Sequence, residues 1–342
     1  MKVLIIGGTG LISTAITRIL AKRGVDLTIY NRGKTEVDIP SSVKTIVGDR
    51  TNYKRFEDRM QPLDHFDCVI DMVCFLAVEA ESLVRAMRGR TKQLVFCSTT
   101  DVYTKPAPNY PVHEDCERNP RESFPYAAEK ARCEKILQKA HAEGAFALTI
   151  IRPSGTDGEG RGLVHSFRGG MYYLKRIRDG LPIITHGDGS SLWSVSHRDD
   201  VGLAFANAVG NPVTFGKTYH VPGEEAITWN QYHEGVAKAM GAPKPKLVHI
   251  PTDLLRRTVP KAAEWCVENF QYNNIFDNTA ARKDLGYRYT IDWNAGVKRI
   301  VAWLDARQLI TRDDEPPFYE RLLKAWEQCK EDIESAIKSF KN

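Results

Sequence analysis

A tyrosine and a lysine four residues apart form one of the two clear chemical signals in the sequence. They occur in Tyr126-Ala-Ala-Glu-Lys130, directly after Pro125. Residues at this spacing share one face of a helix, with Cβ atoms about 6 Å apart. A free tyrosine has a pKa of about 10 and is a poor base at neutral pH, but a nearby ammonium favours the phenolate. The pair therefore predicts a proton-transfer site in which Lys130 tunes Tyr126.

A glycine-rich turn near the N-terminus is the second signal, and it predicts a dinucleotide site. The apolar run Val3–Ile6 leads into this turn, and the helical pattern Leu11–Lys22 follows it. Gly7 allows a tight turn, and Gly10 lets backbone N–H groups approach a pyrophosphate at the positive end of the helix. Ser13 stands where such turns usually have a third glycine. The predicted cofactor-binding residues of this turn are Gly7, Thr9, Gly10, Leu11 and Ile12.

Strand and helix patterns alternate through the first half of the chain. The predicted strands are Val3–Ile6, Leu27–Tyr30, Val43–Val47, Cys68–Met72, Leu94–Cys97 and Ala147–Ile151. The predicted helices between them are Leu11–Lys22, Val78–Met87 and Tyr126–His141. The fold class is therefore α/β: a Rossmann-type doubly wound parallel sheet, whose ligand crevice lies at the carboxyl ends of the strands, with a smaller C-terminal substrate-binding lobe.

The alternation ends after Arg152-Pro153, where glycine turns and proline-marked segments take over. We predict a dinucleotide-binding domain over residues 1–154, to which residues 196–222 return, and a substrate lobe over residues 155–342 with helices at Trp229–Met240 and Trp293–Leu304. The final segment, Phe318–Phe340, has one apolar stripe typical of an amphipathic helix. Packing of this stripe against its own chain is the favoured interpretation, and a dimer contact is the alternative.

The composition indicates an ordinary soluble protein. The 342 residues are 42% hydrophobic and 27% charged, and the net charge of +5 comes from scattered basic residues, which argues against a nucleic-acid partner. Seven cysteines without a CxxC pair fit reduced thiols, and no apolar run approaches the roughly 20 residues of a membrane span. We expect a cytoplasmic protein with no membrane contact. No metal site is expected, because no ligand residues stand at metal-binding spacing.

Together these motifs resemble the extended short-chain dehydrogenase/reductase family, in its sugar epimerase and dehydratase branch. The resemblance covers nearly the whole chain except its C-terminal segment, through the glycine turn, Ser98-Thr99-Thr100-Asp101-Val102-Tyr103, Tyr126–Lys130, Ile151-Arg152-Pro153, His197-Arg198-Asp199-Asp200-Val201 and Asp284-Leu285-Gly286-Tyr287. It implies an NAD(P)-dependent enzyme that oxidises or epimerises a sugar. The alternative is a binding protein on the same fold, because an atypical branch of the family includes chloroplast stem-loop RNA-binding proteins.

The resemblance also implies roles for individual residues. Thr99, four residues before Tyr103, hydrogen-bonds the substrate hydroxyl or carbonyl, with Ser98 and Thr100 as fallback candidates. Tyr126 transfers the proton and Lys130 also holds the cofactor ribose, while hydride passes between the substrate carbon and the nicotinamide.

The reaction type depends on Asp101, which stands where family dehydratases carry the second of two carboxylates. It is either a general base or a cap of the loop after the strand, and the cap is the favoured interpretation. Dehydration is therefore the least supported reaction, behind epimerisation and simple dehydrogenation.

Cofactor choice depends on the end of the second predicted strand, where NAD enzymes usually carry an acidic residue. This chain has neutral Asn31 followed by the basic Arg32 and Lys34, which favours NADP while leaving NAD possible. By resemblance Asp49 contacts the adenine, and Arg50 is placed to reach the 2′-phosphate of NADP. The remaining predicted cofactor contacts are Met72, Val73 and Pro153.

The substrate side departs from the family pattern. Nucleotide-sugar enzymes of the family carry an asparagine shortly after Arg-Pro and an arginine four residues before the histidine of His-x-Asp-Asp, whereas this chain has Ser154-Gly155 and Trp193. An indole offers a stacking face for a sugar ring, so Trp193 and Asp101 are the predicted substrate contacts. The small-molecule partner is predicted to be a free sugar, a glycoside or another polyol. A homodimer through the Tyr126 helix is a further option.

Overall fold

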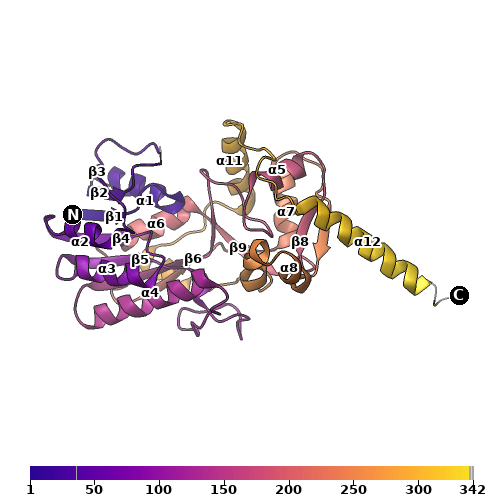
Figure 1. The fold of residues 1–342 in the computed structure, drawn as a ribbon. Coiled ribbons are helices and arrows are strands. Elements are labelled where there is room, and N and C mark those ends of the chain that lie inside the picture. Colours follow the sequence, from indigo (N-terminus) through magenta and orange to yellow (C-terminus); the bar gives the residue numbers. More distant parts are fainter. Residues whose placement is uncertain (36, 339, 341–342) are drawn as a thin grey trace. The chain divides into compact units, whose positions relative to one another are not determined.

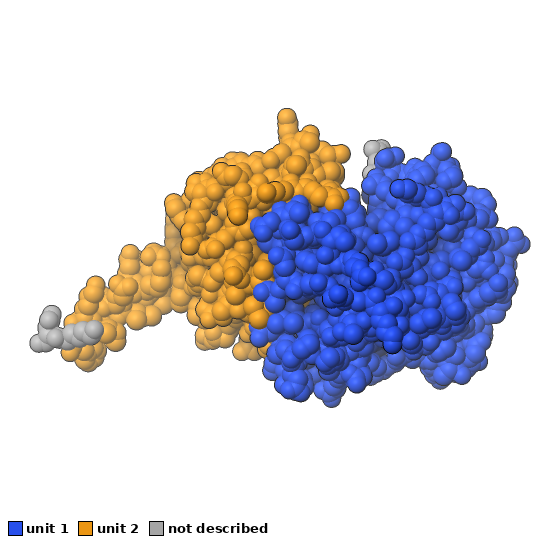
Figure 2. Space-filling view, turned by 180° about the vertical axis from the view of Figure 1, so that it is seen from behind, with its two compact units in different colours: residues 1–158, 193–226, 273–296 blue, residues 159–192, 227–272, 297–342 orange. Residues whose placement is uncertain are grey.

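The computed structural model describes residues 1–35, 37–338 and 340 of the chain. These residues form two compact units, coloured separately in Figure 2. Unit 1 comprises residues 1–158, 193–226 and 273–296, and unit 2 comprises residues 159–192, 227–272 and 297–342. The domain boundaries predicted from the sequence did not assign residues 273–296 to the first domain. This stretch belongs to unit 1 because Ala281, Leu285 and Tyr287 are buried in that unit's core.

Unit 1 is built on a parallel sheet, with seven strands among the described residues (Figure 1). Their order is β10-β6-β5-β4-β1-β2-β3, so the chain starts in the middle of the sheet and winds to both sides. The strands are β1 (Lys2–Ile6), β2 (Asp26–Asn31), β3 (Lys44–Val47), β4 (Phe66–Asp71), β5 (Thr91–Cys97), β6 (Ala147–Pro153) and β10 (Thr218–Val221). This order confirms the predicted Rossmann-type fold.

Helices cover both faces of this sheet, as the alternation of side chains along each strand requires. Val3 and Ile5 of β1 pack in one core with α1 (Leu11–Lys22), α6 (Arg198–Ala208) and α10 (Thr279–Leu285). Leu4 and Ile6 pack in the opposite core with α2 (Tyr53–Met60), α3 (Ala77–Met87) and α4 (Pro125–Ala142). The smaller elements of unit 1 are the 3₁₀ turns η1 (Thr100–Val102) and η2 (Pro212–Thr214), and the parallel pair β7 (Gly155–Asp157) and β9 (Leu192–His197).

Unit 2 contains the parallel strand pair β8 (Ile183–His186) and β12 (Leu247–Ile250). Its helices are α5 (Met171–Arg178), α7 (Trp229–Ala239), α8 (Thr252–Thr258), α9 (Pro260–Trp265), the π-helical turn η3 (Cys266–Phe270) and α12 (Tyr319–Lys338). Three elements include residues of both units: β9, whose first residue Leu192 belongs to unit 2, β11 (Ala226–Thr228) and α11 (Trp293–Asp305).

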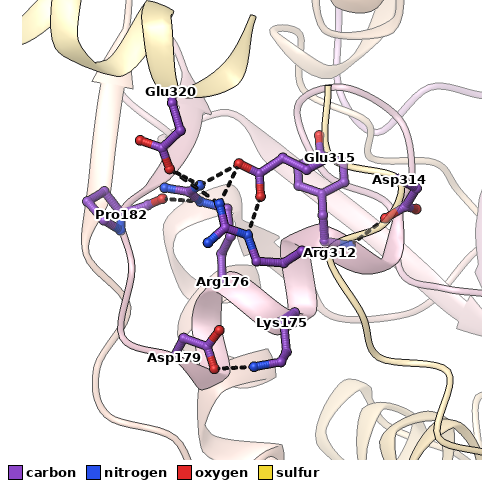
Figure 3. A network of polar contacts seen from close by, with 9 residues as sticks. Lys175, Arg176, Asp179, Pro182, Arg312, Asp314, Glu315 and Glu320 are labelled. Atoms are coloured by element: carbon purple, nitrogen blue, oxygen red, sulfur yellow. Dashed lines mark hydrogen bonds and ion pairs between the residues drawn. The ribbon is translucent and has the colours of Figure 1, made fainter. Parts of the chain in front are cut away.

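A polar network in unit 2 fixes the first turn of α12 (Figure 3). The buried guanidinium of Arg176 donates to Glu315 at 2.8 Å, to Glu320 of α12 at 2.5 Å and to the carbonyl of Pro182 at 2.8 Å. The Arg176 guanidinium also lies over the aromatic ring of Tyr319, which is buried. The Tyr319 hydroxyl accepts a 2.7 Å hydrogen bond from the backbone N–H of Ile184.

The remainder of α12 does not pack on the chain as expected. Ile333, Ile337 and Phe340 are 56%, 53% and 87% exposed, and Figure 1 shows the end of the helix extending away from the rest of unit 2. The favoured interpretation of the apolar stripe is therefore wrong for its C-terminal half. The physical reason is that α12 extends away from unit 2, so only its first turns contact the core of that unit.

Candidate active site

The glycine turn after β1 has the backbone conformation that the sequence predicted. Gly7 and Gly8 have positive φ angles of 114° and 95°, which favour glycine. A Cβ on Gly7 would lie 3.3 Å from Met72 Cβ and 3.4 Å from Val73 Cγ1, so both predicted cofactor contacts flank this turn. The hydroxyl of Ser13 accepts a 2.8 Å hydrogen bond from the N–H of Gly10, which explains how a serine replaces the third glycine.

The first turn of α1 presents a positive helix end. Gly10 is its N-cap and is exposed, Leu11 and Ile12 are half-buried, and no acidic residue lies in the first turn. Unpaired N–H groups at a helix start favour a phosphate, so the residues present fit a dinucleotide pyrophosphate. Half-buried Thr9 completes the turn.

The loop after β2 carries the basic residues expected for a 2′-phosphate. Arg32 and Lys34 are exposed, and the side-chain oxygen of Asn31 accepts a 2.8 Å hydrogen bond from the N–H of Gly33, which orders the turn. Exposed Asp49 lies close to this loop. Hydrogen bonds from Thr51 lower the pKa of Asp49, and the charges of Arg32 and Lys34 lower it further.

Arg50 lies in a different position from the one expected. Its side chain is only 5% exposed, and its guanidinium donates to the buried carboxylate of Asp71 and to the carbonyl of Glu79 at 2.8 Å. The expectation that Arg50 reaches a 2′-phosphate is therefore corrected, because Asp71 at the end of β4 holds it inside the fold.

Four side-chain contacts hold the loop that follows β4. Asp71 accepts a hydrogen bond from the N–H of Val73 at 2.9 Å, and Glu79 accepts from Phe75 at 2.6 Å and Leu76 at 3.0 Å. The fourth comes from α4, where Nζ of Lys130 donates to the carbonyl of Cys74 at 2.8 Å. The loop beside the glycine turn is thus fixed by buried polar contacts.

Helix α4 carries Tyr126 and Lys130 one turn apart, as predicted. Pro125 occupies its first position, where the missing N–H costs nothing, and Tyr126 follows half-buried in the first turn. Lys130 is 1% exposed, and its Nζ also donates to the carbonyl of Cys97 at 2.7 Å. Its ammonium lies 4.7 Å from the ring centroid of Phe75 and 4.9 Å from that of Phe96.

The end of β5 is tied to the same face of α4. Ser98 donates a 2.6 Å hydrogen bond to Glu134, which lies one turn beyond Lys130. Thr99 comes next in the chain and is the N-cap of η1. Ser98, Thr99 and Thr100 are all buried, and Thr99 donates to the carboxylate of Asp101 at 3.0 Å, so the choice of Thr99 stays a prediction.

A buried ion pair links α4 to β6. Arg152 donates to the two oxygens of Glu134 at 2.7 Å and 2.6 Å, and both side chains are almost fully buried. Arg152 also donates to the hydroxyl of Tyr103, which in turn contacts Nε2 of His220 at 2.5 Å. Burial and the charge of Arg152 lower the pKa of His220 to about 3, so this imidazole is neutral at physiological pH. This network was not predicted; it holds Arg152, which directly precedes Pro153, the buried last residue of β6.

Trp193 does not offer the stacking face expected of it. Its indole is 5% exposed, and a Cβ on Gly155 would lie 2.7 Å from the ring atom Cζ2. The ring therefore fills the space that Gly155 leaves open, on the strand β9 that pairs with β7. We correct the substrate role of Trp193 to a packing role.

Metal-ligand clusters and membrane-spanning helices are both absent from the described part of the chain. Among its residues, no three His, Cys, Asp or Glu side chains are grouped so as to hold a metal ion. None of its helices combines the length and the apolar character needed to cross a membrane.

The chain is similar to several known proteins. Residues 76–221 match the model of the NAD dependent epimerase/dehydratase family. The chain is 25% identical over 277 residues to the 2'-dehydrokanamycin reductase of Streptomyces kanamyceticus, covering 81% of this chain and 77% of that protein. It is 27% identical over 261 residues to the chloroplast stem-loop binding protein of 41 kDa b of Arabidopsis thaliana, covering 72% of this chain and 65% of that protein.

The fold is shared with a solved structure of UDP-glucuronic acid 4-epimerase from Bacillus cereus in complex with NAD. The TM-score is 0.71 at 18% identity, over 91% of this chain and all of that one. The sheet order, the glycine turn and the Tyr-x-x-x-Lys helix define an NAD(P)-binding oxidoreductase fold of the Rossmann type. Residues 76–221 thus match an NAD dependent epimerase/dehydratase domain, and the chain is similar to extended short-chain dehydrogenases/reductases.

Proposed function

We propose that this protein transfers hydride between a hydroxyl-bearing carbon of a sugar derivative and a bound NAD(P), with Tyr126 as the proton-transferring group. The observation that carries the proposal is the double anchoring of Lys130 to the carbonyls of Cys74 and Cys97. It fixes one buried positive charge beside the loop after β4 and the end of β5, where the cofactor and substrate groups of such a site belong.

In the proposed reaction Thr99 and Tyr126 bind the reacting oxygen of the substrate. Tyr126 takes the proton when the alcohol is oxidised and returns it when the carbonyl is reduced. The Lys130 ammonium and the positive end of α4 favour the phenolate form of Tyr126, because Tyr126 lies in the first turn of that helix. The nicotinamide, when bound, supplies and receives the hydride.

NADP is the proposed preference. Arg32 and Lys34 are exposed after β2, where a 2′-phosphate would lie, and the glycine turn and α1 would hold the pyrophosphate. Asp49 is proposed to contact the adenine. Arg50 is left out of the phosphate site because Asp71 binds it.

The proposed substrate is a sugar or glycoside without a nucleotide diphosphate, because Trp193 stands where an arginine would grip that group. The relative named 2'-dehydrokanamycin reductase supports carbonyl reduction as one direction of the reaction. A cytoplasmic location and a homodimer through α4 also stay predictions.

The test is a binding measurement followed by a substrate panel. The purified protein is examined by absorbance and mass spectrometry for a retained nucleotide, and NADP and NAD are then titrated. A cofactor that survives purification favours an epimerase, since hydride returns internally; weak, exchangeable binding favours a dehydrogenase. Failure to bind either nucleotide contradicts the proposal and favours a binding protein; the Arabidopsis relative is named a stem-loop binding protein.

A further inference from the structure

Arg168, in the loop that leads into α5, has a backbone conformation that arginine rarely adopts. Its φ angle is 75°, in the left-handed region where any residue with a Cβ loses conformational free energy. Among the described residues other than glycine, only Gln308 also has a positive φ angle. Glycine would fit this position better, and two glycines follow directly, at Gly169 and Gly170. An arginine here is unfavourable for folding, so its side chain is a candidate for a function.

The loop that carries Arg168 is fixed on both sides. Before it, the hydroxyl of Ser166 accepts a 3.1 Å hydrogen bond from the backbone N–H of His186 in β8. After it, the carboxylate of Asp314 accepts a 2.7 Å hydrogen bond from the N–H of Met171 and thereby holds the start of α5. The exposed side chain of Arg168 therefore projects from a loop that is held in place.

The guanidinium of Arg168 lies over an aromatic ring. Its Cζ is 4.5 Å from the ring centroid of Trp265, the half-buried last residue of α9. The Trp265 indole is itself supported by Phe270, which is 1% exposed, and the two ring centroids are 5.9 Å apart. A ring below the face of a guanidinium fixes its plane and leaves the N–H groups along its edge available.

The charge of Arg168 is not paired within the chain. In the part of the chain that the structure describes, its guanidinium forms neither an ion pair nor a hydrogen bond. Three cations of the following helix α5 differ, because each pairs with a carboxylate. These pairs are Lys175–Asp179 at 2.5 Å, Arg176–Glu315 at 2.8 Å and Arg178–Asp305 at 2.8 Å. A guanidinium has five N–H donors, so Arg168 can give all of them to a ligand.

A second arginine–tryptophan pair in unit 2 provides a comparison. The Cζ of Arg307 lies 4.3 Å from the ring centroid of Trp303, and its guanidinium also donates to the carbonyl of Trp303 at 3.3 Å. These residues are one helical turn apart, so their contact is local. The Arg168 pair joins two distant segments and is built on a left-handed residue. Arg307 is therefore a matched control for Arg168.

We propose that Arg168, stacked on Trp265, binds a negatively charged group of the substrate, either a carboxylate or a phosphate monoester. The planar guanidinium presents paired N–H donors that match two oxygens of such a group. The inference rests on the proposed function, because it takes unit 2 as the part of the chain that binds the sugar. It narrows the proposed substrate to an acidic sugar or an acidic glycoside.

The first test detects the contact without any turnover. The side-chain Nε–Hε signals of isotope-labelled arginine are recorded by NMR on the full chain with NADP, and are assigned with Arg168→Lys and Arg307→Lys. Glucuronate, glucose 6-phosphate and glucose are added separately at equal ionic strength. We expect the Arg168 signal to shift with at least one acidic sugar and not with glucose, while the Arg307 signal stays in place.

The pattern of shifts identifies the charged group. A response to glucuronate alone assigns a carboxylate to the site, and a response to glucose 6-phosphate alone assigns a phosphate. An Arg168 signal that responds to neither acidic sugar overturns the proposal. Equal shifts of the Arg168 and Arg307 signals also overturn it, since they would show nonspecific attraction of anions.

The second test separates folding from binding. Arg168→Gly suits the left-handed backbone, so its thermal midpoint should not fall by more than about 3 °C. Its Kd for the acidic sugar should nevertheless rise at least about tenfold, because a charge-assisted contact is lost. Arg168→Lys keeps the charge without the planar fork and should give an intermediate Kd. The control Arg307→Ala should leave the Kd unchanged.

The outcomes distinguish this inference from the proposed function. Unchanged binding of the acidic sugar in Arg168→Gly would make the inference wrong, whatever reaction the chain catalyses. Turnover of neutral sugars alone, with the same KM in Arg168→Gly, would support the proposed function and overturn the inference. A KM for an acidic sugar that rises at least about tenfold in Arg168→Gly, with kcat little changed, supports both. Binding through Arg168 without oxidation of any alcohol would contradict only the proposed function.

Discussion

Lys130 donates a 2.7 Å hydrogen bond to the carbonyl of Cys97, two residues before Thr99. The lysine of the Tyr-x-x-x-Lys motif is therefore also a structural clamp between α4 and β5. A second bond to Cys74 extends the clamp to the loop after β4. The proposed proton transfer and the stability of the folded chain therefore both depend on the ammonium group of Lys130.

Replacement of Lys130 should consequently affect both properties. In Lys130→Met two buried carbonyls lose their donor, at a cost of about 1–3 kcal/mol each in the free energy of unfolding. Turnover should also become undetectable. Denaturant unfolding and the substrate assay measure the two effects, with Lys135→Met on an exposed position of α4 as the matched control. Full stability in Lys130→Met would contradict the clamp.

Tyr126 should be needed for chemistry but not for folding. Tyr126→Phe removes only the hydroxyl from a half-buried ring near Phe75 and Phe124. We expect turnover to fall by about 10²–10⁴-fold, the usual contribution of a positioned acid–base group, with cofactor Kd unchanged. Tyr110→Phe, on an exposed residue, serves as the control. Turnover retained in Tyr126→Phe would refute the proposed mechanism.

Arg32 should determine the preference for NADP. Loss of its charge in Arg32→Ala removes a charge-assisted contact with the 2′-phosphate worth about 1.5–3 kcal/mol, which is roughly a 10- to 150-fold change in Kd. The Kd for NAD should change little, because NAD has no such phosphate. Calorimetric titration of both nucleotides against Arg32→Ala and the exposed control Lys22→Ala decides this. Equal losses for NAD and NADP would rule out the phosphate role.

Buried histidines should make the protein sensitive to acid. Burial lowers the pKa of His165 and His186 to about 4 and that of His233 well below its usual value. Below about pH 6.5 the unfolded chain binds protons that the folded chain does not. Stability should therefore fall as the pH drops from about 6.5 to about 4, with up to about 1.4 kcal/mol lost per pH unit for each such histidine.

Urea unfolding at a series of pH values checks this slope. His186→Gln should flatten it, since glutamine does not titrate, whereas His113→Gln at an exposed position should leave it unchanged. The pH dependence would have to come from other groups if both variants behaved alike.

The C-terminal half of α12 should be dispensable for folding. Deleting residues 330–342 removes the exposed Ile333, Ile337 and Phe340 and should leave the thermal midpoint within about 2 °C. Tyr319→Phe, by contrast, leaves the N–H of Ile184 without its acceptor and should cost about 1–3 kcal/mol. A large drop in the midpoint on truncation would show that the exposed stripe is covered in solution, and sedimentation would then test for a dimer.

The sequence was sufficient to predict six strands of the sheet and the motifs at their ends, but not the strand β10, for which only a segment returning to the sheet was expected. Val3–Ile6 and Leu94–Cys97 are apolar runs of strand length, and the glycine turn has few structural alternatives. Thr99 and Tyr126 were predicted to share one site from the family resemblance, and that site stays a prediction.

Pairings between distant residues were not predictable from a single sequence. Arg50 was expected at the cofactor because nothing near it in the chain reveals that Asp71 binds it. Trp193 was expected to face a sugar because its fit against Gly155 depends on how β7 and β9 pair. No role was predicted for Lys105, because its hydrogen-bond partner Asn274 lies 169 residues away in the sequence. Local periodicity carries no information on such contacts.

The position of β10 in the sheet has a consequence for synthesis on the ribosome. β6 pairs with β5 on one side and with β10 on the other, and β10 ends at Val221. Until residue 221 has left the exit tunnel, β6 is an open edge that offers its unpaired backbone groups to any other extended chain. Chaperone contact with the nascent protein should therefore concentrate in the interval between the completion of β6 and the arrival of β10.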